Sequence, residues 1–127
     1  MLKNLVSEPS NILYPESYAN FIKDNLSKKL PIKILNKKDI TKIGLNCILA
    51  VNQGSQKDPR VVTFGPNNPK VKEVDVLFVG KGVCFDTGGI SIKPSNGMEE
   101  MKWDMGGSAV VTALMNLLSS TNPDFTY

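Results

Sequence analysis

The sequence predicts an α/β fold, with a mixed sheet flanked by helices. Apolar residues recur first at helical spacing and then in strand-like alternation, and the two patterns take turns along the chain. A nearly continuous apolar, β-branched run at 74–80 is typical of a strand in a buried sheet. The composition, 41% hydrophobic and 21% charged over 127 residues, fits one globular domain with its own core.

The first helix is expected to begin at Pro15 and Glu16, which suit a first helical turn. Its apolar stripe has the spacing of a helix and comprises Tyr18, Phe21, Ile22, Leu26 and Leu30. Residues 31–36 alternate and predict a short strand.

Residues 37–55 predict one or two short helices, with Asp39 as the candidate cap and Gly54 and Ser55 at the exit into a loop. A second strand is expected at 59–66, where it runs into a Gly-Pro turn. Residues 67–75 are polar and indicate a loop or a hairpin tip.

In the second half, residues 74–80 predict a strand buried on both faces and residues 82–85 a shorter one. Residues 86–107 contain five glycines and one proline, so a long loop with one helical turn is expected. A helix at 108–120 and a short polar tail follow. The apolar stripe expected on that helix is Val110, Ala113, Leu114, Leu117 and Leu118.

Charge and hydropathy exclude several classes of protein. The net charge is +3, and the paired lysines form no basic run with interleaved aromatics, so a solvated surface is favoured over nucleic-acid binding. No apolar stretch reaches the roughly 18 residues of a membrane span. The first ten residues lack the apolar core of a signal peptide. A cytoplasmic protein is expected.

Cys47 and Cys84 both lie in apolar runs, which favours buried free thiols in a reducing compartment over a disulfide. Histidine is absent from the sequence. Without it, a serine or cysteine triad is excluded within this chain, and so are the commonest general base and the commonest zinc ligand.

Four charged residues lie within 24 positions at element ends or in the glycine-rich loop: Lys81, Asp86, Lys93 and Asp104. Ligands of open α/β sheets gather beyond the carboxyl ends of strands. Asp104 precedes the last helix, where the helix dipole and free amides favour an ionised carboxylate that can ligate a cation.

The spacing of these four charged residues is also compatible with explanations other than a cation site. Two surface salt bridges between these lysines and aspartates would explain the charges and contribute roughly 0–1 kcal/mol. A phosphate-binding loop fits poorly, because Gly82 rather than serine or threonine follows Lys81. The dinucleotide-binding pattern lacks its third glycine, since position 85 is Phe85.

The stretch VGKGVCFDTGGISIKPSNGMEEMKWDMGGSAVV resembles the metal-site segment of the leucyl aminopeptidase (cytosol aminopeptidase) family. The family pattern is VGKG-x-x-FDSGG-x-S-x-KP, a spacer, and D-M-GG-A, with Thr87 here in place of the usual serine. Upstream, NLVSEPSNILYPE and GLNCILAVNQGSQKDPRVV also resemble the family, so the likeness covers residues 4–119.

The resemblance implies a two-metal aminopeptidase that releases N-terminal residues such as leucine from peptides. Lys81, Asp86 and Asp104 would be metal ligands, with Asp86 bridging two ions and Lys81 binding through a neutral amine. Nitrogen and carboxylate donors suit zinc, manganese or magnesium without choosing among them.

In the same family Lys93 would stay charged, face the substrate and stabilise the negative charge that develops on the scissile carbonyl. Met101 would line the pocket for the substrate's first side chain, since a methionine wall accepts varied apolar groups. A solvent-facing lysine and a plain core methionine are the alternatives. Trp103 stands where the family more often has a small residue.

A second family motif, NTDAEGR, does not occur in this sequence. In the family it supplies an aspartate and a glutamate to the metals and an arginine that holds a bicarbonate base. Residues 1–127 are therefore expected to be the N-terminal part of the catalytic domain, without the family's N-terminal domain and C-terminal half, and inactive alone.

The alternative is a non-catalytic module that binds metal weakly or complements a separately encoded half. Some bacterial members of the family bind DNA, but nothing basic enough in this sequence supports that role. The homo-hexamer of the family is built by surfaces that lie mostly outside this segment.

Overall fold

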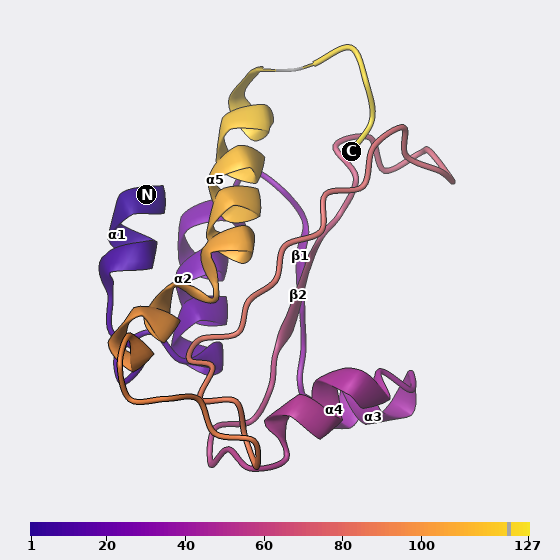
Figure 1. The fold of residues 1–127 in the computed structure, drawn as a ribbon. Helices are drawn as coiled ribbons and strands as arrows, with labels where there is room; N and C mark the ends of the chain where they lie inside the picture. Colours follow the sequence, from indigo (N-terminus) through magenta and orange to yellow (C-terminus); the bar gives the residue numbers. More distant parts are fainter. Residues whose placement is uncertain (122) are drawn as a thin grey trace.

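The computed structural model describes residues 1–121 and 123–127. The predicted α/β class is confirmed, with helices packed beside a small sheet (Figure 1). In chain order the elements are α1 (Leu2–Ser7), α2 (Pro15–Leu26), β1 (Ile32–Leu35), α3 (Lys37–Lys42), α4 (Asn46–Asn52), β2 (Val61–Phe64), the 3₁₀ helix η1 (Met98–Trp103) and α5 (Gly106–Thr121).

The sheet of the described residues has two strands, and they fall within the strands expected at 31–36 and 59–66. β1 pairs antiparallel with β2, with Ile32 opposite Phe64 and Leu35 opposite Val61. One further hydrogen bond, from the Gly65 N–H to the Pro31 carbonyl at 2.7 Å, extends the ladder past the strand ends.

The core lies where α2 and α5 pack together and meet one face of the sheet. Tyr18 and Ile22 of α2 share one cluster with Met105 and Ala109, at the start of α5. A second cluster holds the other end of the two helices and comprises Leu26, Leu30, Met115 and Tyr127. Ile32 and Phe64 pack against both clusters and so connect the sheet to the helices.

The apolar stripe expected on α5 is partly wrong. Val110 and Leu117 are 53% and 58% exposed, whereas Ala109, Thr112 and Met115 are buried. The helix is apolar on more than one side, so its own periodicity does not decide which side is covered. The position of α2 decides which side of α5 is covered.

The two strands expected at 74–80 and 82–85 are wrong as regular strands. The segment is extended and runs past α5 (Figure 1), but no ladder forms on it among the described residues. Phe78 packs into the second core cluster, while Leu77 and Val79 are 78% and 83% exposed. A strand buried on both faces needs a covering layer on each, and here one face is bare.

Local expectations also need correction. The N-cap of α3 is Asn36, whose side chain accepts from the Lys38 and Asp39 N–H groups. Asp39 completes a capping box, because its carboxylate accepts from the Asn36 N–H.

Cys47 is exposed rather than buried, because α4 packs no residue into the core. Cys84 is half-buried rather than fully buried, and both cysteines are free, as expected.

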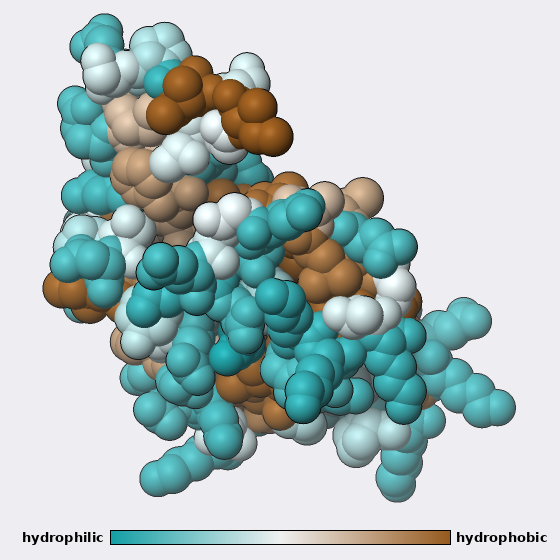
Figure 2. All heavy atoms as spheres, turned by 90° about the horizontal axis from the view of Figure 1, so that it is seen from below, coloured by the Kyte–Doolittle hydropathy of each residue, from teal (hydrophilic) through white to brown (hydrophobic). Residues whose placement is uncertain are grey.

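Apolar side chains also reach the surface. On the face drawn in Figure 2 they form separate patches between hydrophilic residues. Among the exposed apolar residues are Ile43, Val51, Ile90 and Ile92. In the described part of the chain, no helix combines the length and apolarity that crossing a bilayer requires.

Candidate metal centre

Lys81 is held where the extended segment meets the first turn of α5. The Ser108 N–H donates to the Lys81 carbonyl at 2.8 Å. The backbones approach so closely that a Cβ on Gly80 would lie 2.7 Å from the Gly107 carbonyl oxygen and 2.8 Å from the Ser108 nitrogen. Glycine at position 80 is therefore required for this contact.

The side chains of Lys81 and Asp104 form an ion pair, with 2.6 Å between Nζ and Oδ1. Asp104 follows η1 and stands two residues before α5 begins. Its side chain is 22% exposed, against 59% for Lys81. The other carboxylate oxygen, Oδ2, is buried and has no hydrogen-bond partner among the described residues.

Asp86 and Lys93 form a second pair, with 2.9 Å between Oδ2 and Nζ. Asp86 Oδ1 also accepts from the Gly88 N–H at 2.9 Å. The Lys93 hydrogen bond chiefly, and then the Gly88 hydrogen bond, lower the pKa of Asp86 below its ordinary value. The charges of Lys93 and, to a smaller extent, of Lys81 also lower this pKa.

The loop that carries Lys93 turns back on itself. The Lys93 N–H donates to the Thr87 carbonyl at 2.9 Å, and Gly88 takes the left-handed conformation with φ of 88°. This turn brings the Lys93 amine to 2.9 Å from the Met101 sulfur as well as to Asp86. The structure thus gathers Lys93 and Met101 beside Asp86.

The five residues singled out from the sequence form two groups, Lys81 with Asp104 and Lys93 with Asp86 and Met101. The salt bridges that spacing alone allowed are present in the structure. Each pair is partly exposed, so neither is an argument for stability by itself.

The donors present fit a divalent cation in part. The buried, unpartnered Oδ2 of Asp104 is a carboxylate oxygen without a positive partner of its own, which is costly unless a cation or a donor meets it. Two carboxylates and one amine make a mixed oxygen and nitrogen set. Within the described residues, no group of three or more His, Cys, Asp or Glu side chains could hold a metal ion. Lys81 would have to complete the set.

Sequence reasoning missed the residues behind this centre. Ser108 received no role, and Tyr18 was expected only as a core residue. The hydroxyl groups of both meet beneath Lys81. A serine directly after the glycine pair was the available signal, since the first turn of a helix needs small or polar residues where another backbone approaches.

Trp103 is 52% exposed, and nothing in the structure explains why a tryptophan stands at this position.

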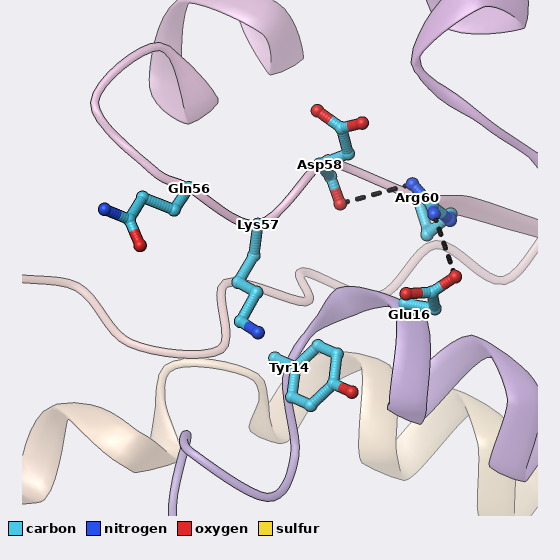
Figure 3. A pocket seen from close by; sticks show the side chains of 6 residues that line it. All are labelled: Tyr14, Glu16, Gln56, Lys57, Asp58 and Arg60. Carbon is cyan, nitrogen blue, oxygen red and sulfur yellow. Dashed lines mark hydrogen bonds and ion pairs between the residues drawn. The ribbon is translucent and has the colours of Figure 1, made fainter.

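A polar pocket of about 290 Å³ lies elsewhere, and its lining includes none of the candidate residues (Figure 3). Arg60 lies 3.4 Å from Glu16, and the Lys57 amine lies 4.3 Å from the centre of the Tyr14 ring. Both cationic side chains of the pocket, Arg60 and Lys57, therefore already interact with other residues that line it. The rest of the lining is Gln56 and Asp58.

A family comparison covers nearly the whole chain. The profile described as "Cytosol aminopeptidase family, catalytic domain" matches residues 1–126. The chain belongs to this family.

Curated relatives within the cytosol aminopeptidase family are close in sequence. A probable cytosol aminopeptidase of Nitrobacter winogradskyi is 51% identical over 118 residues, and one of Wolbachia pipientis wMel is 47% identical over 120 residues. These matches cover 93% and 94% of this chain but 24% of each relative. The chain therefore spans about a quarter of the length of the curated relatives it matches.

Solved structures of similar proteins have the same fold over most of this chain. The bottromycin maturation enzyme BotP in complex with Mn gives a TM-score of 0.85 at 32% identity, over 98% of this chain and 27% of that one. The cytosol aminopeptidase from Coxiella burnetii gives 0.82 at 31% identity, over 93% and 25%.

Proposed function

We propose that residues 1–127 are the N-terminal part of an aminopeptidase catalytic domain and supply part of a two-metal site. The complete site would release N-terminal residues such as leucine from peptides in the cytoplasm. One observation carries this proposal: Lys81 pairs with Asp104 and Lys93 with Asp86, and the first pair includes a buried carboxylate oxygen that lacks a partner among the described residues.

Lys81, Asp86 and Asp104 would hold the metal, with Asp86 shared between two ions. Manganese, zinc and magnesium all suit such donors, and the similar enzyme BotP was solved in complex with Mn. When bound, the ions supply a Lewis acid and an activated water. To act as a ligand, Lys81 has to give up the proton that it now shares with Asp104.

Lys93 would bind and orient the substrate. Its ammonium, which pairs with Asp86 in the structure, would face the scissile carbonyl and stabilise the negative charge that develops there. Met101, in contact with Lys93, would line the pocket for the first side chain of the peptide.

The base and part of the ligand set are not supplied by this sequence. The NTDAEGR string, with its bicarbonate-holding arginine, does not occur in it. We therefore propose weak metal binding and no peptide hydrolysis by the chain alone. A polypeptide segment that carries this motif would have to be present for activity.

Metal binding tests the proposal directly. Titration of Mn²⁺ into the purified chain should give a saturable heat by calorimetry, and Asp104→Asn should weaken the affinity by about tenfold or more, or roughly 1.4 kcal/mol. Asp58→Asn is the matched control, because Asp58 also pairs with a lysine but lies outside the centre. Equal affinities in all three proteins would refute the assignment of Asp104.

The two ion pairs favour a second candidate, a non-catalytic module in which the lysines merely neutralise the aspartates. An assay with a leucine anilide separates the two. The chain should be silent alone and active with a polypeptide that carries the NTDAEGR motif, and Asp86→Ala should abolish that activity. If the leucine anilide is not cleaved by the chain alone or with that polypeptide, and the chain binds no Mn²⁺, the second candidate is favoured.

A further inference from the structure

Three buried or partly buried hydroxyl groups lie directly behind the candidate metal centre. The Tyr18 hydroxyl of α2 is 3.2 Å from Ser108 Oγ and 3.3 Å from Thr112 Oγ1, both on α5. Tyr18 and Thr112 are 5% and 1% exposed. Burial raises the pKa of Tyr18, so its hydroxyl keeps its proton and can donate.

Ser108 Oγ has two hydrogen-bond partners in this cluster. It lies 2.7 Å from the Met105 carbonyl oxygen, which can only accept, and 3.2 Å from the Tyr18 hydroxyl. The cluster therefore fixes the rotamer of Ser108 from two sides.

Ser108 is also the residue on which the Lys81 backbone rests. Its N–H donates to the Lys81 carbonyl at 2.8 Å. A Cβ on Gly82 would lie 3.2 Å from Ser108 Oγ, so the serine side chain packs against the chain on the other side of Lys81. Gly80 contacts the Ser108 backbone in the same way.

We propose that Tyr18 and Ser108 are positioning residues for Lys81. They hold the first turn of α5 against residues 80–82, and this contact sets the Lys81 amine at 2.6 Å from Asp104. The role of the Lys81 amine as a metal ligand rests on the proposed function. Its positioning beside Asp104 by Tyr18 and Ser108 does not depend on that function.

The test is zero-length cross-linking with a water-soluble carbodiimide, which joins an amine to a carboxylate only when the two are in contact. Mass spectrometry of the digested chain should find the Lys81–Asp104 and Lys93–Asp86 links. The second link is an internal control, because it belongs to the loop and not to α5.

Tyr18→Phe and Ser108→Ala should each lower the Lys81–Asp104 yield relative to the Lys93–Asp86 yield, by about twofold to tenfold for the loss of one or two hydrogen bonds. Tyr127→Phe is the matched variant, since Tyr127 lies in the other core cluster and should leave the ratio unchanged. If one of the two variants does not fold, Thr112→Val removes the hydroxyl that faces Tyr18 and keeps the shape of the side chain.

An unchanged ratio of the two yields would overturn the proposal. This holds whether both yields stay the same or both fall equally, since an equal fall marks general loosening of the structure. Mn²⁺ affinity measured on the same proteins should fall with the ratio. If the unaltered chain binds no Mn²⁺, the proposed function fails, while the cross-link ratio still decides whether Tyr18 and Ser108 position Lys81.

Discussion

At the scale of single residues, Gly88 controls the turn that returns Lys93 to Asp86. Its φ of 88° is left-handed, and a Cβ there would collide with the Ser91 carbonyl oxygen. Gly88→Ala is expected to lower the free energy of unfolding by about 1–3 kcal/mol, because it adds both backbone strain and a clash.

Gly89→Ala is the control for that prediction. Gly89 is also left-handed, with φ of 71°, but a Cβ there meets open space. Strain alone should cost about 1 kcal/mol. Urea denaturation of both variants gives the comparison, and a larger loss for Gly89→Ala would contradict the geometry.

The two cysteines should differ in reactivity. Burial raises the pKa of Cys84 to about 11, so its thiol stays protonated at neutral pH, while Cys47 is exposed. Alkylation by iodoacetamide at about pH 7.5, near the low edge of thiol titration, should label Cys47 first by mass spectrometry. Cys84 should gain rate as the pH rises toward its own pKa, and equal rates near neutral pH would argue against its burial.

The four charged residues form the two salt bridges that their spacing allowed, whereas the environments of other residues were predicted less well. Their roles toward metal and substrate came from the family resemblance and stay predictions. The exposure of Cys47 could not be predicted from its apolar neighbours, since α4 packs away from the core. The asparagine cap was missed because Asn36 and Asp39 act as a reciprocal pair in which either residue suits the first turn.

At the scale of elements, a clamp joins the loop before the extended segment to the tail. Asp75 Oδ2 accepts from the Thr126 N–H at 2.8 Å and from its hydroxyl at 2.7 Å. The Thr126 N–H chiefly, and its hydroxyl next, lower the pKa of Asp75. Beside this clamp, the Tyr127 N–H donates to Asn67 Oδ1 at 3.1 Å.

The sign of the pH dependence follows from that lowered pKa. The clamp should be fully formed above the ordinary aspartate pKa of about 3.9 and be lost as the pH falls through the lower folded value. The protection factor of the Thr126 amide, measured by hydrogen exchange and NMR, should fall over that acid range. Asp75→Asn should remove the step, and an unaltered step would place the titration elsewhere.

Elements whose pattern is local were predictable from the sequence. α2 and both strands fall where spacing, capping proline and alternation place them. The segment 74–85 could not be predicted in the same way, because a ladder depends on a partner elsewhere in the chain. α1 was missed, although Leu2, Leu5 and Val6 have helical spacing, because six residues make a weak pattern.

At the scale of the whole molecule, the bare side of the extended segment should drive association. Leu77 and Val79 are among the most exposed apolar residues, and β-branched edges pair readily. Size-exclusion chromatography over a range of concentrations should show mass growing with concentration. Val79→Lys should reduce that growth, and Ile12→Lys, at another exposed apolar position, should not. An equal effect of both would point to charge alone.

The contact between Lys93 and the Met101 sulfur has an oxidative consequence. A thioether is a weak acceptor, so Asp86 holds the Lys93 amine with little competition. Oxidation of Met101 to the sulfoxide would place a strongly polar oxygen beside the same amine. The lysine would then have two comparable acceptors, and the loop would become a peroxide-sensitive part of the molecule that a sulfoxide reductase could reset.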